Sequence, residues 1–318
     1  MLYELSKKIV HVNARFGLII QISSVSTPNM QSLVQEMKKD TRIHWVSNYA
    51  TRPSYLFDGV CMNLTIHLSQ KDDKTIDNLK IYTTQYIRWY KEYREFLFKN
   101  IIYNQTSKEN YLFEYAIPKF ETCRDTKILS KILKQKNNIS TYLQPSKLST
   151  NQEIFYRTAG GRYFKIFYDT DFNTESKCNK SKCFQEKYDK YTLISVLSSN
   201  LWWFYYTLHF DMYNCKDYMI FNFPFDYEKC SYNAQLEKLG MEYCKSLTTN
   251  AENKKQSYET TGERQQRIFK PSLSKELINE IDKVLAKHYG LTEEELDYII
   301  NYDIKYRMGD SLNGGEDE

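Results

Sequence analysis

The alternation of apolar and polar positions predicts regular elements from the start of the chain. An apolar run at Gly17–Ser23 predicts a buried strand, and a Thr-Pro pair predicts the start of a helix over Pro28–Lys39. β-Branched and apolar residues predict two further strands, at Arg42–Asn48 and Val60–Ser69. This order predicts an α/β sheet. Because a helix end leads directly into the first strand, we expect the later part of a sheet whose earlier strands precede this sequence.

The middle of the chain shows a second, more aromatic pattern. Leu79–Thr83 predicts a short strand, and apolar residues at four-residue spacing predict an amphipathic helix over Tyr86–Ile101. Another helix is expected over Lys127–Gln135. Aromatic alternation over Ile154–Tyr168 predicts a hairpin around two glycines, whereas the polar stretch Asp171–Asp189 predicts a loop.

The last third of the chain predicts helices. Asp189 is suited to cap a long apolar helix, in which Leu193–Phe210 carries no charged residue. Because polar side chains interrupt this segment, it predicts a buried helix rather than a membrane span. The N-terminus carries no signal-peptide pattern, so we expect a cytoplasmic protein with no membrane partner.

Helix signals continue to the end of the sequence. Helices are expected over Ala234–Leu247 and Ser274–His288, joined by a polar linker at Thr248–Lys270. Thr292 and Glu295 form a capping-box pattern that predicts the start of a final helix. Residues 310–318 predict a disordered acidic tail.

Composition narrows the class of protein. The 318 residues include only 10 Gly and 6 Pro, which excludes collagen-like and linker-rich chains. The sequence contains no G-x-G and no Pro-Pro pair. The seven cysteines form no C-x-x-C pair, so we expect free thiols and no metal site. The sequence contains no P-loop, no G-x-S-x-G and no H-E-x-x-H, so none of these enzyme motifs is present. His67 lies within a predicted strand, which favours a solvent-facing or packed side chain over a general base.

Charge is balanced overall but not locally. Lys119–Lys165 holds ten basic and three acidic residues, and Gly290–Glu318 holds nine acidic and two basic residues. A basic segment that also carries aromatic residues is typical of polyanion binding. A low-GC genome, which enriches lysine and tyrosine everywhere, explains the same composition without a function.

Two segments offer nucleic-acid chemistry. The hairpin places Arg157, Arg162, Tyr163 and Lys165 beside its glycines, where arginine can hold phosphates or guanine edges and tyrosine can stack on a base. The alternative is an aromatic hairpin that packs its own core.

The second segment is the loop Asn48–Val60, which joins two predicted strands. Such a loop lies near a sheet edge, where α/β folds bind ligands. Arg52 in this loop is a candidate DNA contact, and Phe57 is a candidate for stacking on an extruded base. The alternative for Phe57 is an anchor tucked under the sheet.

Six segments occur together in an order that is familiar from one family. They are FGLIIQISSVSTPNMQSL, SNYATRPSYLFDGVCMNLTIHLSQ, YRTAGGRYFKIF, VLSSNLWWFYYT, FNFPF and ELDYIINYDIKYRMG. From about Phe16 to Gly309 the chain resembles the later part of the adenine-N6-specific DNA methyltransferases of restriction–modification systems, of the TaqI-like and type IIG kind.

The resemblance implies a domain order and roles. In this order, the end of a Rossmann-like methyltransferase sheet would occupy residues 1–85, and a connecting segment would occupy 86–125. An α+β target-recognition domain that binds double-stranded DNA would follow at 126–235, and a helical region at 236–309. Phe57 would pack against the flipped adenine. Arg52, Arg157, Arg162, Tyr163 and Lys165 would contact DNA.

The sequence also departs from that family. Its members bind S-adenosylmethionine through a Gly-rich loop and hold the target amino group with an Asn-Pro-Pro-Tyr motif, and this sequence has neither. We therefore expect a C-terminal fragment that binds no cofactor alone and needs an N-terminal methyltransferase half encoded upstream. A stand-alone DNA-binding specificity module is the alternative, and a helical scaffold without nucleic acid is a weaker one.

Overall fold

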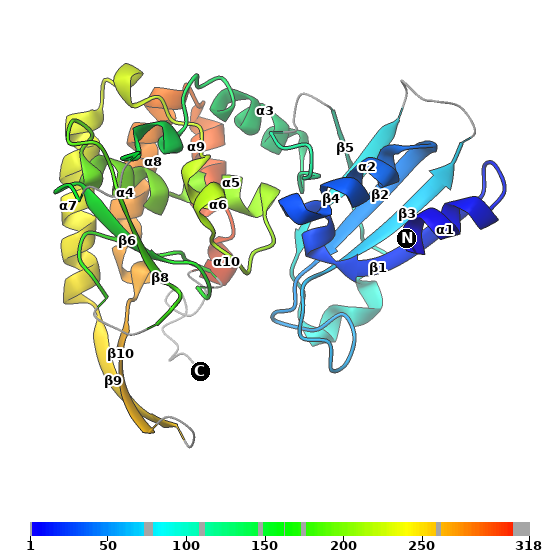
Figure 1. Ribbon diagram of the computed structural model, residues 1–318, viewed down its shortest axis with the longest axis horizontal. Coiled ribbons are helices and arrows are strands. Elements are labelled where there is room, and N and C mark those ends of the chain that lie inside the picture. The colour runs from blue at the N-terminus through cyan, green and yellow to red at the C-terminus, as the bar shows by residue number, and fades with distance from the viewer. Residues whose placement is uncertain are drawn as a thin grey trace. The chain divides into compact units, whose positions relative to one another are not determined.

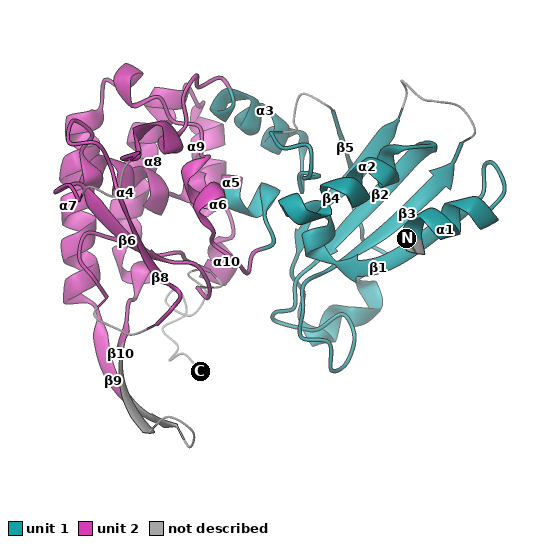
Figure 2. Ribbon diagram, in the orientation of Figure 1, with its two compact units in different colours: residues 1–133, 206–211 teal, residues 134–205, 212–318 magenta. Residues whose placement is uncertain are grey.

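The computed structural model describes residues 2–72, 79–107, 112–145, 149–161, 163–172, 176–258 and 262–307. The chain forms two compact units (Figures 1 and 2): unit 1 comprises residues 1–133 and 206–211, and unit 2 comprises residues 134–205 and 212–318. Both units combine helices with strands, so the predicted α/β class is confirmed. The functional boundaries expected after residues 85, 125 and 235 stay predictions, because these units reflect compactness alone.

Unit 1 is built on a mixed sheet of five strands in the order β1-β3-β2-β4-β5. The strands are β1 (Arg15–Gln21), β2 (Thr41–Tyr49), β3 (Leu64–Lys71), β4 (Lys80–Ile87) and β5 (Asn104–Thr106). β2 and β4 run parallel, and the other neighbouring strands are antiparallel. The first three strands predicted from the sequence are confirmed as strands, with ends shifted by a few residues. The expected burial of the first strand is wrong, because every residue of β1 is exposed or half-buried.

Three helices complete unit 1, namely α1 (Leu2–Ile9), α2 (Gln31–Lys38) and α3 (Cys123–Ile132). Val34 of α2 packs with Val46 of β2 and Ile81 of β4 in a buried cluster. Each such side chain contributes about 1.5–3 kcal/mol when it leaves water. The periodic apolar face of α2 is therefore what fixes this helix to the sheet.

A chain of buried polar side chains crosses the sheet of unit 1. Tyr3 Oη lies 2.6 Å from Ser69 Oγ, which lies 2.6 Å from His44 Nδ1. His44 Nε2 then lies 3.0 Å from His67 Nδ1, and His67 Nε2 lies 3.0 Å from Ser24 Oγ. Both histidines are fully buried, so the packed alternative for His67 is confirmed.

The predicted amphipathic helix over Tyr86–Ile101 is wrong. β4 continues through Ile87, because Tyr86 and Ile87 pair with Asn48 and Tyr49 in the parallel ladder, and a 3₁₀ helix, η3 (Lys91–Phe96), follows. The side chains at four-residue spacing do not all share one buried face, since Tyr93 is 60% exposed. Backbone pairing with the neighbouring strand β2 therefore determined the conformation of Tyr86 and Ile87, although the local sequence pattern is helical.

Unit 2 combines a sheet of three strands, in the order β7-β6-β8, with a helical body. The strands are β6 (Glu153–Arg157), β7 (Phe167–Tyr168) and β8 (Asn179–Cys183). The helices are α4 (Lys190–Ser198), α5 (Asn200–His209, whose end belongs to unit 1), α6 (Asp217–Phe221), α7 (Asn233–Thr249), α8 (Lys275–Tyr289), α9 (Glu293–Asn301) and α10 (Ile304–Arg307). Among the described residues, no helix has the length and apolar character needed to cross a bilayer.

The predicted apolar helix begins as expected but divides in two. Asp189 caps α4 by accepting a 2.7 Å hydrogen bond from the Thr192 amide. The helix stops at Ser199, and α5 starts where the Asp282 carboxylate of α8 accepts hydrogen bonds from the amides of Asn200 and Leu201 at 3.2 and 3.1 Å. Burial raises the pKa of Asp282 to about 6. A carboxylate 82 positions away in the sequence thus caps the second helix.

Two segments predicted as irregular contain strands. The stretch Asp171–Asp189 includes β8, which pairs antiparallel with β6. The stretch Thr248–Lys270 includes β9 (Glu252–Tyr258) and β10 (Gly262–Ile268), which pair with each other. The sequences of β8, β9 and β10 lack the alternation of apolar and polar residues that predicts a strand, because pairing with another strand holds these residues extended.

The predictions for the C-terminal helices are confirmed. Thr292 and Glu295 form both hydrogen bonds of the capping box at the start of α9. Gly290 ends α8 with φ of 67°, a left-handed conformation that glycine adopts without strain. The expected tail at residues 310–318 lies outside the described residues.

Candidate nucleic-acid interface

The loop between β6 and β7 is the predicted glycine hairpin in a longer form. β6 and β7 pair through Phe155–Tyr168 and Tyr156–Phe167, so residues 158–166 form the connection. Its first residue is fixed on both sides, because the Thr158 amide donates to Cys178 O at 2.8 Å and Thr158 O accepts from the Cys215 amide at 2.9 Å. The hairpin is confirmed in its pairing, and its connection is anchored to two other segments of unit 2.

The two glycines of this loop adopt backbone conformations that shape the loop. Gly160 and Gly161 both have positive φ, 82° and 64°. A Cβ atom on Gly161 would lie 2.1 Å from Phe164 O, whereas nothing lies within 4 Å of a Cβ on Gly160. Gly161 therefore allows the chain to approach its own backbone.

Replacing Gly161 with alanine is expected to destabilise unit 2 by about 1–3 kcal/mol more than replacing Gly160, because only Gly161 adds a backbone clash to the left-handed strain. Urea unfolding of Gly161→Ala and Gly160→Ala measures the difference in the free energy of unfolding. Equal midpoints for the two variants would contradict the close approach.

Two residues of this loop make described contacts within unit 2. Lys165 is 7% exposed, and its ammonium donates to Gly160 O at 2.6 Å. Tyr163 is half-buried, and its carbonyl accepts from Arg307 Nε at 3.0 Å. Arg162 lies outside the described residues. Lys165 is thus engaged in shaping the loop, while the predicted DNA contacts of Tyr163 and Lys165 stay predictions.

Cations do gather at one end of the sheet of unit 2. Arg157 ends β6 and pairs opposite Asn179, which lies between Lys177 and Lys180 in the sequence. All three cations are exposed, and no salt bridge joins any of them to another described residue. We call Arg157, Lys177 and Lys180 the cationic end. Both lysines of the cationic end lie within the stretch 171–189 that we predicted as a loop.

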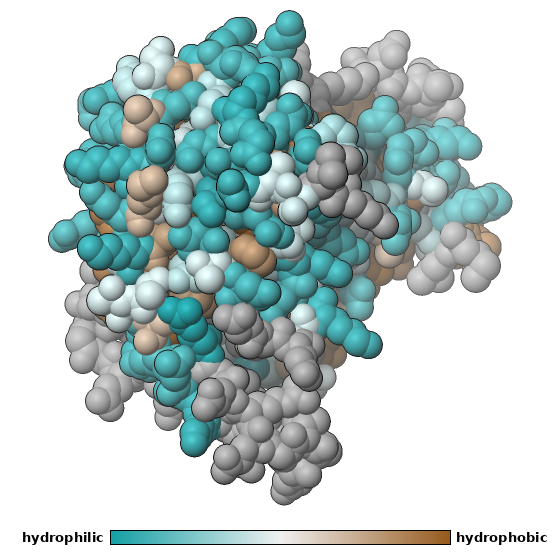
Figure 3. Space-filling model, turned by 60° about the vertical axis from the view of Figure 1, so that its left-hand side comes forward, coloured by the Kyte–Doolittle hydropathy of each residue, from teal (hydrophilic) through white to brown (hydrophobic). Residues whose placement is uncertain are grey.

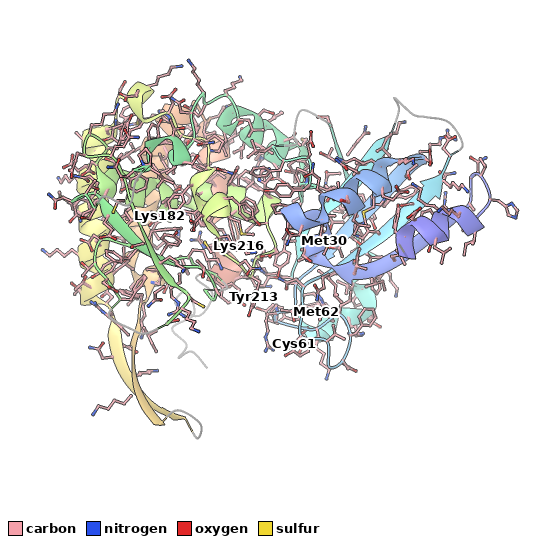
Figure 4. All side chains as sticks on the ribbon, in the orientation of Figure 1. Met30, Cys61, Met62, Lys182, Tyr213 and Lys216 are labelled. Carbon is pink, nitrogen blue, oxygen red and sulfur yellow. The ribbon has the colours of Figure 1, made fainter. Side chains whose placement is uncertain are left out.

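Other exposed groups of unit 2 extend its polar surface. Figure 4 labels Lys182, Tyr213 and Lys216, which lie on β8 and just before α6. Lys182 forms a 3.1 Å salt bridge with Asp217, whereas Lys216 is exposed and Tyr213 is 68% exposed. Figure 3 shows that the face of unit 2 turned toward the viewer is mainly hydrophilic.

The second candidate segment, the loop after β2 in unit 1, presents Phe57 to solvent. Phe57 is 41% exposed in a turn closed by a 3.1 Å hydrogen bond from the Val60 amide to Phe57 O. Leu56 is the buried anchor instead, and Arg94 donates to its carbonyl at 2.9 Å. Arg52 lies over the ring of Tyr55, 4.9 Å from the centroid. The carboxyl end of β2 thus carries an exposed aromatic ring on a braced loop.

Part of the predicted basic segment is internal. Lys119 is 1% exposed and donates to Leu208 O at 3.1 Å, within unit 1. Burial lowers the pKa of Lys119 to about 7, which disfavours its charged form. Two of the ten basic residues counted in this segment, Lys119 and Lys165, are thus buried side chains.

A cofactor would need a pocket among the described residues, and a metal ion would need a cluster of ligand side chains. Unit 1 has a pocket of about 470 Å³ lined by residues of β4, of η3 and of the segments next to them, among them Trp89, Tyr93 and Phe96, and it includes none of the expected site residues. No group of three or more His, Cys, Asp or Glu among the described residues is placed to hold a metal ion. All seven cysteines are free thiols.

Comparisons with known proteins give a weak result. No family model and no curated protein matches this chain. Among solved structures, one match is described as an ATP-dependent Type ISP restriction-modification enzyme LlaBIII bound to DNA, with a TM-score of 0.29 and 10% sequence identity. It covers 76% of this chain and 26% of that one, so the chain spans about a quarter of that enzyme. A TM-score of this size does not establish a shared fold.

Proposed function

We propose that this chain binds double-stranded DNA and is the target-recognising part of an adenine-N6 DNA methyltransferase of a restriction–modification system. The cationic end carries this proposal, because exposed like charges that form no salt bridge with another described residue are the chemistry that phosphates recruit. The order of the six sequence segments supports the family. The exposed ring of Phe57 supports contact with an extruded adenine.

S-Adenosylmethionine fits poorly with the residues of this chain. A glycine loop that binds such a cofactor follows a strand and opens a helix. Of the described glycines with positive φ, Gly59 lies in the loop before β3, Gly160 and Gly161 lie in the β6–β7 loop, and Gly290 ends α8. None of them has that placement, so we derive no methyl-transfer step from this chain. We propose that an N-terminal methyltransferase half supplies the cofactor site and the Asn-Pro-Pro-Tyr motif.

In this proposal the chain positions the substrate. Arg157, Lys177 and Lys180 neutralise phosphates, which fixes the register of the protein on the duplex. The Phe57 ring stacks on the extruded base and offsets part of the few kcal/mol that unstacking costs. A stand-alone DNA-binding module is the second candidate, and a cognate N-terminal half that restores methylation when mixed with this chain distinguishes the two.

Duplex DNA binding by this chain is expected to weaken about a hundredfold between 50 and 200 mM salt if about four phosphates are contacted. The paired change Arg157→Gln and Lys180→Gln is expected to reduce the slope of log K against log[salt] by about 2. Fluorescence anisotropy with a labelled duplex measures both quantities.

The matched control is Lys238→Gln with Lys245→Gln, which removes the same charge from the exposed side of α7. It should leave the slope close to that of the unmodified chain. Binding that ignores salt, or a control that matches the Arg157/Lys180 variant, would contradict the proposed interface.

A further inference from the structure

The pocket of unit 1 combines aromatic rings with polar side chains in its lining. Its volume of about 470 Å³ lies within the range of about 300–1,000 Å³ that small-ligand sites occupy. Tyr93 and Phe96 in the lining are 60% and 44% exposed, whereas Trp89 and Leu97 in the lining are buried. Exposed rings therefore stand at the mouth of the pocket, and buried side chains form its inner part.

The inner part of the pocket is held by the core of unit 1. Trp89 and Leu97 belong to a buried cluster that includes Leu56. The Arg94 guanidinium lies 5.5 Å from the centroid of the Trp89 ring and donates to Leu56 O at 2.9 Å. The buried Nε1–H of Trp89 has no acceptor among the described residues. Because buried polar groups in proteins are nearly always paired, this donor marks a place where a ligand can supply an acceptor.

Two polar side chains lie next to each other in the lining. Gln85 Nε2 donates to Glu121 Oε1 at 3.3 Å, and both residues line the pocket. The backbone of Glu121 is fixed, because its amide donates to Asp125 Oδ2 at 2.6 Å and its carbonyl accepts from Asn104 Nδ2. An amide has two N–H groups and a carboxylate accepts up to about four hydrogen bonds, so the contact between them uses only part of their capacity. Side by side, they offer a ligand one donor followed by two acceptors.

We propose that this pocket binds a guanine base, which stacks on the exposed rings and pairs its Watson–Crick edge with Gln85 and Glu121. That edge presents the O6 acceptor followed by the N1–H and N2–H donors, which is the complement of an amide donor beside a carboxylate. Adenine and cytosine place a ring acceptor beside their amine, and thymine and uracil place one N–H between two carbonyls. Guanine is therefore the common base whose two adjacent donors suit a carboxylate, while aromatic rings stack on any base.

The same chemistry has two sources, a free guanine nucleoside or nucleotide and an unpaired guanine in a single strand. A guanine paired in duplex DNA already uses the edge that the pocket requires, so intact duplex is not its ligand. The pocket belongs to unit 1, whereas the cationic end belongs to unit 2. The proposal therefore goes beyond the proposed function and does not depend on it.

Isothermal titration calorimetry of the full chain identifies the ligand. Guanosine should bind at least about tenfold more tightly than inosine, which lacks only the N2 amine, and than adenosine, which turns a ring acceptor toward the carboxylate. The single strands d(TTGTT) and d(TTATT) distinguish the sources: displacement of guanosine by d(TTGTT) alone shows that a strand reaches the pocket, and displacement by neither assigns it to free nucleosides and nucleotides. No binding of guanosine at millimolar concentration, or equal affinities for the three nucleosides, would overturn the proposal.

Glu121→Gln tests the polar wall, because it replaces one carboxylate acceptor with an amide donor. Guanosine should bind about tenfold more weakly, and xanthosine, which has an oxygen in place of the N2 amine, should now bind more tightly than guanosine. A misfolded variant would not gain xanthosine. The matched control is Glu95→Gln, which changes an exposed carboxylate of η3 outside the described lining and should keep the preference for guanosine. An unchanged preference in the Glu121 variant would contradict the proposed pairing.

Tyr93→Leu tests the stacking wall. It should weaken guanosine and inosine alike by about fivefold or more, because a stacking ring is lost while the polar wall stays. Tyr90→Leu is the control, since Tyr90 is 37% exposed in the same segment but outside the described lining. Equal affinities of these two variants for guanosine would show that the base does not stack there. Both Tyr93→Leu and Glu121→Gln should leave the salt dependence of duplex binding unchanged, so this proposal and the proposed function fail or stand separately.

Discussion

Replacing Arg307 with alanine is expected to destabilise unit 2 by about 3–5 kcal/mol. Arg307 is 7% exposed at the end of α10, and its guanidinium donates to Asn200 Oδ1 and, at 3.0 Å, to Tyr163 O. The same group lies 4.3 Å from the ring centroid of Phe164 and 4.9 Å from that of Trp203. One side chain therefore joins the C-terminal helix, the start of α5 and the β6–β7 loop.

The size of this effect follows from what alanine leaves behind. Truncation leaves a buried amide oxygen and a buried carbonyl without their donor, which costs about 1–3 kcal/mol for each group. It also removes a positive charge that lowers the pKa of the buried Asp282 carboxyl. Lysine restores the charge but not the planar donor geometry, so Arg307→Lys should recover only part of the stability.

Urea unfolding followed by hydrogen exchange in α5 measures this prediction. Lys305→Ala is the matched control, because Lys305 is an exposed cation two residues away on the same helix. Its free energy of unfolding should stay within about 0.5 kcal/mol of the unmodified chain. An Arg307→Ala variant as stable as this control would show that the loop does not depend on the C-terminal helix.

Acidification is expected to destabilise unit 1 between pH 7 and pH 5, by about 2 kcal/mol from His44 alone and further from His67. Burial lowers the pKa of His44 to about 3 and also lowers the pKa of His67, whereas an unfolded histidine titrates near 6.5. The unfolded state therefore binds protons first as the pH falls. The stability that the neutral pair contributes is complete above pH 6.5 and is lost below it, at about 1.4 kcal/mol per pH unit for each ring.

The geometry explains why the pair stays neutral. His44 Nε2 and His67 Nδ1 lie 3.0 Å apart, so one ring must donate and the other accept. If both rings carried two protons, an N–H would face an N–H. The ammonium groups of Lys38 and Lys7 add a further repulsion that lowers the pKa of His44.

The test measures urea unfolding of unit 1 from pH 7.5 to pH 5, with exchange in β2 as the reporter. His67→Gln should reduce the dependence on pH. His11→Gln removes an exposed histidine and should leave the dependence unchanged. A pH profile that His67→Gln does not alter would show that other groups cause acid unfolding.

The sequence determined the elements whose signals are local. The capping box of Thr292 and Glu295, the cap at Asp189 and the strand β1 each depend on residues within a few positions, so their patterns predicted these elements. The apolar run of β1 did not predict its exposure. The composition of the β6–β7 hairpin likewise predicted its pairing. The presence of Phe57 in a loop at a sheet edge was predictable, but its exposure was not.

Only the tertiary structure decided the features that depend on distant partners. Ser199 ends a helix because Asp282 caps the next one, and β9 pairs with β10 without any apolar alternation. Lys119 and Lys165 count as basic in the sequence, yet burial removes both from the surface. Short-range propensity operates within a few residues, whereas burial, charge exposure and strand pairing are set by groups far apart in the sequence. The sequence therefore determined the elements and the candidate chemistry, and the tertiary structure decided which cations and rings remain available to a ligand.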